Sequence, residues 1–127
     1  MSASKQDNVA VWFEIPAANF ERAVGFYEKV FDTKLKRDQF ESSRLAIFPY
    51  EGQGVSGCVM AGDGYKPARD GSVVYLSAGK DLAVPLSRAA ANGGAVAIPK
   101  TALPDGMGFF AQFIDTEGNR VGLHSMG

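Results

Sequence analysis

The chain has 127 residues, of which 46% are hydrophobic and 21% are charged, and its formal net charge is −1. This composition is that of one globular domain, and it excludes the disordered, collagen-like and membrane-spanning classes. Because the charges are scattered and nearly balanced, the sequence provides no electrostatic surface for nucleic acid or for an anionic membrane.

The sequence does not predict a secretory signal peptide or a membrane-spanning segment. Residues 1–8 lack the apolar stretch of a signal peptide, and no later run approaches the roughly 20 apolar residues that span a bilayer. A cytoplasmic location is therefore expected. Cys58 is the single cysteine, so the sequence predicts neither an internal disulfide nor a zinc site of the Cys/His type.

The first half of the chain predicts the order β-α-β-β-β. Residues 9–15 are rich in β-branched and aromatic side chains and stop at Pro16, which is typical of a strand. Asn19 can cap the helix that follows, and apolar residues recur there at helical spacing, so Phe26, Tyr27 and Phe31 are expected to be buried. Residues 34–40, 44–50 and 55–61 are further strands, which completes a module over about 8–62.

The second half repeats this order after a connector rich in Gly, Pro and Asp at residues 62–71. A strand at 72–78 precedes a helix capped by Asp81, and strands at 95–99, 108–114 and 119–124 complete a second module over about 71–127. A constant shift sets Asn19 on Asp81, which indicates an internal repeat within one domain, 1–127.

Motifs at both ends carry a resemblance to a known family. The stretches that carry it near the start are residues 13–16, residues 21–23 and the pair Phe26-Tyr27. Those near the end are residues 113–119 and 122–124. Together these stretches resemble the glyoxalase / bleomycin-resistance / extradiol-dioxygenase (vicinal oxygen chelate) superfamily. The resemblance implies an α+β fold in which two βαβββ modules form a curved, mostly antiparallel eight-stranded sheet around a cavity, with the helices outside.

The resemblance also implies a divalent metal with up to four His, Glu or Gln ligands, which this chain does not provide. The positions that match lie on or near Ala10 and Ser72, on Gly122, and within residues 57–60, where Cys58 is the one conceivable donor. A divalent ion that holds a reactive water needs about three protein ligands. We therefore expect no cofactor, with a divalent metal disfavoured.

Strand alternation selects the residues of the candidate binding site in the first module. If Ala10 faces the cavity, Trp12 and Glu14 face it too, while their neighbours meet the helix. Trp12 is then a candidate contact for a ligand or a core residue, and Glu14 is a candidate contact or a solvated strand residue. Cys58 and Met60 share parity on a flanking strand, where core packing is the alternative role.

The second module contributes the sole histidine, His124, on the last strand. A histidine can transfer protons near neutral pH, although a single one is more often structural. Pairing through the turn at 115–119 puts Phe110 and Gln112 on the face of His124. Phe48 and Tyr75 are expected to line the same apolar cavity, which would suit an aromatic or amphipathic ligand.

Three functions from different classes follow. The first is a protein that binds a small apolar or aromatic compound without the superfamily metal, and the absent ligands favour it. The second is a metal-dependent lyase or dioxygenase of the superfamily, and the third is a metal-free enzyme that uses Glu14 or His124. A homodimer, common in the superfamily, would let a partner chain complete the cavity; the sequence decides neither this nor the identity of the ligand.

Overall fold

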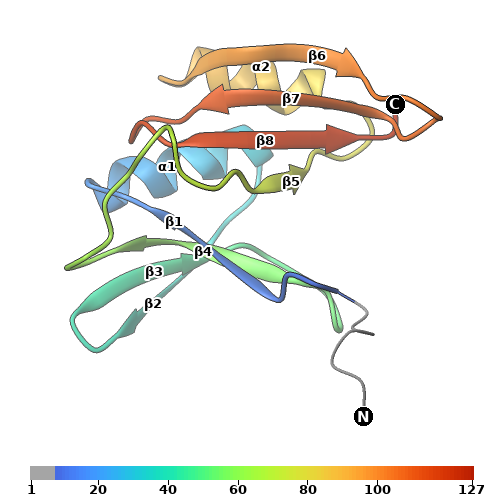
Figure 1. Ribbon diagram of the computed structural model, residues 1–127. Coiled ribbons are helices and arrows are strands. Elements are labelled where there is room, and N and C mark those ends of the chain that lie inside the picture. Colours follow the sequence, from blue (N-terminus) through green and yellow to red (C-terminus); the bar gives the residue numbers. More distant parts are fainter. Residues whose placement is uncertain (1–7) are drawn as a thin grey trace.

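The computed structural model describes residues 8–127 and has two βαβββ modules, as predicted (Figure 1). We name the first five elements module one and the last five module two. Module one comprises β1 (Trp12–Pro16), α1 (Phe20–Phe31), β2 (Lys36–Phe40), β3 (Ser43–Ile47) and β4 (Ser56–Ala61). Module two comprises β5 (Tyr75–Ser77), α2 (Ala83–Ala91), β6 (Ala95–Ala102), β7 (Phe109–Ile114) and β8 (Arg120–Ser125).

Each module builds its own four-stranded sheet, in the orders β1-β4-β3-β2 and β5-β8-β7-β6. The first strand of each module pairs in parallel with the last, and all other pairs are antiparallel. The described strands thus form two sheets where a single eight-stranded sheet was expected. A side-chain hydrogen bond joins the two modules: the Asn119 amide nitrogen donates to the Pro16 carbonyl oxygen at the end of β1, at a distance of 2.7 Å.

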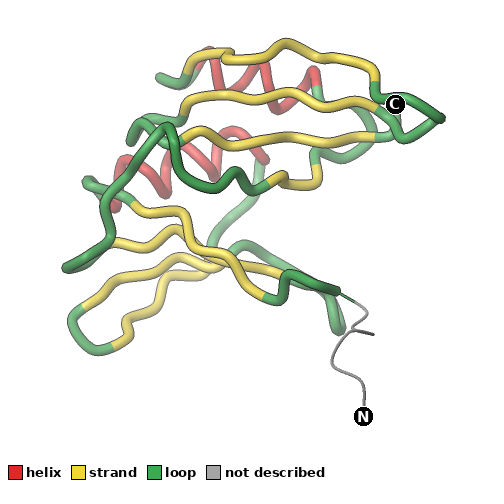
Figure 2. Tube along the Cα trace, viewed as in Figure 1, coloured by secondary structure: helices red, strands yellow, loops and turns green. Residues whose placement is uncertain are grey.

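Both helices cover the same side of the sheets, which leaves the other side open (Figure 2). Asn19 caps α1 as predicted, because its side chain accepts a hydrogen bond from the backbone N–H of Arg22. Phe26 and Tyr27 are buried, and Phe31 packs against the core. Within residues 8–127, neither helix is long and apolar enough to cross a membrane.

Helix α1 joins the two halves into one hydrophobic core. The Tyr27 ring lies 5.6 Å from that of Phe48 in module one and 6.2 Å from that of Phe113 on β7. The Phe26 ring is 5.8 Å from that of Phe113. Because one helix packs against side chains from both modules, neither module buries its apolar residues alone.

The internal repeat differs by one residue from the expected alignment. Helix α2 begins after Leu82, although the Asp81 carboxylate still accepts a hydrogen bond from the backbone N–H of Ala83. Asn19 therefore corresponds to Leu82 and not to Asp81. The first strands agree with this correction, since Trp12 and Tyr75, the residues that begin β1 and β5, have the same separation in sequence.

The turn between β7 and β8 ties module two to the start of α1. The buried Asp115 carboxyl accepts a hydrogen bond from the Tyr27 hydroxyl at 2.7 Å and holds the turn through the backbone N–H groups of Glu117 and Asn119. The Glu117 carboxylate accepts from Arg22 and from two backbone N–H groups at the start of α1. The turn motif of the sequence is thus a joint between modules.

Candidate functional site

The open face of module one carries the residues that strand alternation selected. Trp12 pairs with Ser56 and Glu14 with Cys58 across β1 and β4, so these side chains share one face. Phe13 and Ile15 lie on the opposite face and belong to the core packing. Trp12 is 44% exposed.

The open face of module two carries the second group. Tyr75 pairs with Gly122, and Gly122 with Gln112 on the far side of β8. His124 pairs with Phe110 in the same way. Tyr75, Gln112, Phe110 and His124 therefore lie on one face, as the predicted register requires.

A shallow pocket of about 380 Å³ lies on this face of module two and is lined by Tyr75, Leu103, Phe110 and His124. The rings of Tyr75 and Phe110 meet edge to face with their centroids 6.3 Å apart. Its walls are mostly apolar, with a hydroxyl and an imidazole among them, which is the usual character of a small-molecule site. We call this the Tyr75 pocket.

The absence of a side chain at Gly122 leaves the space that the Tyr75 ring occupies. A Cβ built on Gly122 would lie 2.3 Å from the ring of Tyr75, closer than atoms can approach. The ring thus lies across β8 over a backbone without a side chain. The position that the resemblance assigns to a metal ligand is here part of the support for an aromatic side chain.

A chain of hydrogen bonds leads from the strand start to the pocket. The Arg120 guanidinium donates to the Gln112 side-chain oxygen at 2.9 Å, and the Gln112 amide nitrogen donates to the Tyr75 hydroxyl at 2.6 Å. Arg120 was not among the residues selected for the site from sequence. Its parity on the last strand, shared with His124, was the signal that could have found it.

His124 is held by the loop before β7. Its Nε2 atom lies 2.8 Å from the backbone carbonyl of Met107. A carbonyl oxygen accepts only, so Nε2 must carry a hydrogen in this arrangement. In the neutral ring Nδ1 is then the basic nitrogen, and the imidazole has a defined orientation at the pocket wall.

Glu14 lines a different pocket. This one, of about 250 Å³, lies where the end of β1 meets the start of β8, and Lys66 and Arg120 also line it. The carboxylate raises the pKa of the Tyr65 hydroxyl, after the larger effect of desolvation, so the connector residue Tyr65 lies against Glu14. Among the described pockets, Glu14 and His124 share none, and they form no acid–base pair here.

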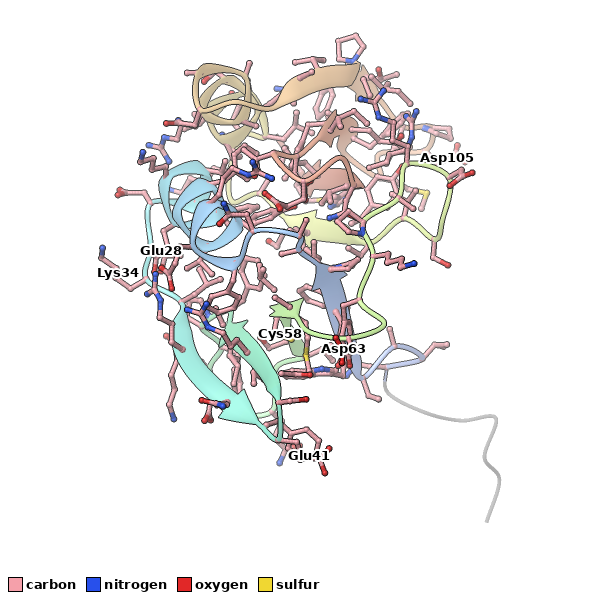
Figure 3. All side chains as sticks on the ribbon, turned by 90° about the vertical axis from the view of Figure 1, so that its left-hand side faces the viewer. Glu28, Lys34, Glu41, Cys58, Asp63 and Asp105 are labelled. Atoms are coloured by element: carbon pink, nitrogen blue, oxygen red, sulfur yellow. The ribbon has the colours of Figure 1, made fainter. Side chains whose placement is uncertain are left out.

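Cys58 and Met60 are buried, with their sulfur atoms 3.8 Å apart. Burial, with a smaller contribution from the Glu14 carboxylate, raises the pKa of the Cys58 thiol to about 12. A thiol with such a pKa is protonated near neutral pH and is a poor nucleophile. Figure 3 shows Asp63, at the start of the connector, in the same part of the molecule as Cys58.

Phe48 was expected beside Trp12 but lies on the helix side. Its ring contacts those of Phe13, Tyr27 and Phe31 at centroid distances of 5.6 to 6.2 Å. The reason is that Phe48 follows β3, which ends at Ile47, and strand alternation turns successive side chains to opposite faces. Phe48 lines a separate cavity of about 350 Å³ beneath the end of α1.

Comparison with known proteins places this fold in a family. The model of the Glyoxalase/Bleomycin resistance protein/Dioxygenase superfamily matches residues 9–123. The chain belongs to this superfamily. No curated protein matches the sequence.

Solved structures of superfamily proteins have the same fold. Glyoxalase I from Zea mays matches with a TM-score of 0.65 and 17% identity over 91% of this chain and 45% of that one. A glyoxalase/bleomycin resistance protein from Albidiferax ferrireducens T118 matches with a TM-score of 0.70 and 13% identity over 91% and 97% of the two chains. The fosfomycin resistance protein FosX from Listeria monocytogenes matches with a TM-score of 0.61 and 16% identity over 95% and 93%.

These likenesses establish the fold alone, because the identities are low. The chain also spans less than half of the maize protein. A shared fold does not determine the substrate of this superfamily member.

The metal of the superfamily does not fit the side chains present. Ala10 and Ser72 are exposed and precede the strands, so the open-face positions that begin β1 and β5 are taken by Trp12 and Tyr75. Gly122 has no side chain to supply a ligand atom. Within residues 8–127 no three His, Cys, Asp or Glu side chains are grouped so that they could hold an ion.

Proposed function

We propose that this superfamily member binds a small apolar or aromatic compound in the Tyr75 pocket without a divalent metal. The observation that carries the proposal is the pocket itself, in which two aromatic rings and Leu103 form the walls. Its volume of about 380 Å³ is in the range of small-molecule sites. The oriented His124 and the Tyr75 hydroxyl supply a few polar groups, which is the usual basis of specificity.

A metal-free enzyme is the second candidate, and the geometry of His124 favours it over one that uses Glu14. The Met107 carbonyl fixes the hydrogen on Nε2 and leaves Nδ1 as the basic nitrogen. Such a ring could remove a proton from a bound compound. A metal-dependent lyase or dioxygenase is disfavoured, because the positions expected to hold ligands carry an alkyl group, a hydroxyl, no side chain, or the buried Cys58 thiol, which its raised pKa keeps protonated.

Two further expectations belong to this proposal. One is a cytoplasmic location, which cell fractionation would test. A homodimer would cover part of the open faces, where Trp12 and Tyr75 are 44% and 45% exposed. Sedimentation or light scattering of the purified protein measures whether it forms a homodimer.

Binding of the neutral fluorescent probe N-phenyl-1-naphthylamine tests the function. Its emission should rise on binding to the wild type, and Phe110→Ala should weaken binding about two- to tenfold, since aromatic contacts contribute roughly 0.5 to 1.5 kcal/mol. Phe40→Ala is the matched control, because Phe40 is 64% exposed on β2, outside the pocket. Equal affinity of both variants, or no binding to the wild type, would reject the Tyr75 pocket as the site.

Metal analysis of the same dialysed protein tests the metal-free part of the proposal. We expect no stoichiometric zinc, nickel, iron or manganese. Trp12→Ala tests the remaining expectation for module one, namely that Trp12 contacts the ligand and reports its binding by a change in emission. A twofold or larger loss of probe affinity would support that contact, and unchanged affinity would confine the site to module two.

A further inference from the structure

The hydrogen-bond chain that ends at Tyr75 has only one consistent direction. A guanidinium has donors and no acceptor, so the group of Gln112 that faces Arg120 must be its oxygen. The amide nitrogen then faces Tyr75 and donates to the hydroxyl oxygen at 2.6 Å. The hydroxyl therefore acts as the acceptor in this contact and keeps its own hydrogen for another partner.

That hydrogen has no acceptor within residues 8–127, where the Tyr75 hydroxyl forms no second hydrogen bond. The side chain is 45% exposed and forms one wall of the pocket. The free hydrogen is thus available to a compound lying against Phe110 and Leu103. A donor that finds an acceptor in its ligand contributes to both affinity and selectivity.

The positive charge of Arg120, at the other end of this series of hydrogen bonds, strengthens the Tyr75 hydroxyl as a donor. Arg120 forms no ion pair with a carboxylate in the part of the chain that the structure describes. Its positive charge polarises the Gln112 amide, which in turn polarises the Tyr75 hydroxyl, because hydrogen bonds in a chain reinforce one another. Glu14 lines a pocket with Arg120, and its negative charge opposes this effect.

We propose that the Tyr75 pocket selects aromatic compounds that carry a carboxylate or carbonyl oxygen, which accepts a hydrogen bond from Tyr75. The inference rests on the proposed function and adds the polarity of the ligand. It assigns Tyr75 as the group that contacts the ligand oxygen, while Gln112 and Arg120 act as positioning residues. The apolar part of the compound would lie against Phe110 and Leu103.

The test compares two naphthalene probes of similar size and opposite charge, naphthalene-2-carboxylate and 2-naphthylmethylammonium, by isothermal titration calorimetry. The wild type should prefer the carboxylate about tenfold, the effect of one charge-assisted hydrogen bond. Tyr75→Phe keeps the ring and removes the hydroxyl, so it should abolish the preference. Circular dichroism checks that this variant is folded.

Gln112→Glu gives the sharper result. The substitution keeps the shape of the side chain at position 112 and reverses the direction of its hydrogen bond with the Tyr75 hydroxyl. A carboxylate accepts from Arg120 and also from Tyr75, so the hydroxyl would turn its hydrogen inward and present only lone pairs to the pocket. The preference should then reverse toward the ammonium probe. Gln53→Glu adds the same charge at an exposed turn and should leave the preference as in the wild type.

The outcomes separate the two proposals. If the wild type binds N-phenyl-1-naphthylamine but shows no preference between the charged probes, the inference about ligand polarity is wrong and the proposed function stands. The inference also fails if Tyr75→Phe retains the preference, or if Gln53→Glu shifts it as much as Gln112→Glu. If N-phenyl-1-naphthylamine does not bind the folded wild type, both proposals fail, because the inference rests on the proposed function.

Discussion

At the scale of single residues, the core contains a polar group whose role can be measured. The Tyr27 hydroxyl is fully buried and donates to the Asp115 carboxyl at 2.7 Å. Burial, and then the negative charge of Asp115, raises the pKa of Tyr27 well above its ordinary value. The phenol thus remains a donor throughout the working pH range, and the hydrogen bond ties α1 to the turn of module two.

We expect Tyr27→Phe to lower the free energy of unfolding by about 1 to 3 kcal/mol, because the change leaves a buried acceptor with one donor fewer. Urea unfolding followed by circular dichroism measures this. Tyr50→Phe, at a side chain that is 59% exposed, should change stability by less than about 0.5 kcal/mol. If the two variants were equally stable, the hydrogen bond would contribute nothing net.

At the scale of elements, the contact between β5 and β8 depends on the missing side chain of Gly122. We predict that Gly122→Ala displaces the Tyr75 ring, since the added Cβ would lie 2.3 Å from it. The cost should be about 1 to 3 kcal/mol, typical of an overpacked site. Thermal unfolding gives the cost, and loss of N-phenyl-1-naphthylamine binding would report the moved ring. An unshifted Tyr75 in a crystal structure of the variant would contradict the prediction.

The start of α1 and the β7–β8 turn are joined by Glu117, whose side chain is fully covered in its ion pair with Arg22. Desolvation raises the pKa of Glu117, but hydrogen bonds from Arg22, Asn19 and Thr116 outweigh it and hold the pKa below 4.5. A carboxyl with a lowered pKa in the folded state stabilises the protein above its unfolded pKa. That contribution is lost as the pH falls through the folded pKa.

We therefore expect Glu117→Gln to destabilise the protein by roughly 1 to 3 kcal/mol at pH 7, where charged hydrogen bonds are lost. The difference from the wild type should shrink as the pH falls below 4.5, because the wild type then loses the same contribution. Denaturant titrations at a series of pH values measure both. A difference that stayed constant down to pH 3 would show that the charge of Glu117 is not responsible.

At the scale of the whole molecule, two sheets share one core. The core cluster runs from Ile15 of β1 to Leu123 of β8, and α1 contacts both modules through Tyr27. Neither half can unfold without exposing apolar residues of the other. This arrangement predicts cooperative unfolding of the chain as one unit.

The prediction is tested with the full chain. Trp12, the single tryptophan, reports module one by fluorescence, whereas far-ultraviolet circular dichroism reports the strands and helices of both modules. The two urea transitions should coincide in midpoint and slope. Two separated transitions would mean that the modules fold independently despite the shared core.

The sequence by itself determined the order of elements, the cap of α1 and the face of most site residues. These features depend on local rules: Asn19 caps because its side chain reaches a nearby N–H group, and strand alternation sets Trp12 and Glu14 on one face. The same rule, applied across the turn at 115–119, put Gln112 opposite Gly122, as observed. The start of α2 lies one residue later than the sequence predicted.

Only the tertiary structure decided which of these residues meet. Glu14 and His124 line different pockets, and the Phe48 ring packs against rings of both β1 and α1. The two hydrogen bonds that link Arg120, Gln112 and Tyr75 join side chains of three strands. No local sequence pattern encodes the distances between these side chains. Such contacts depend on how the two sheets and one shared helix pack, a non-local property in which burial and side-chain volume outweigh local preference.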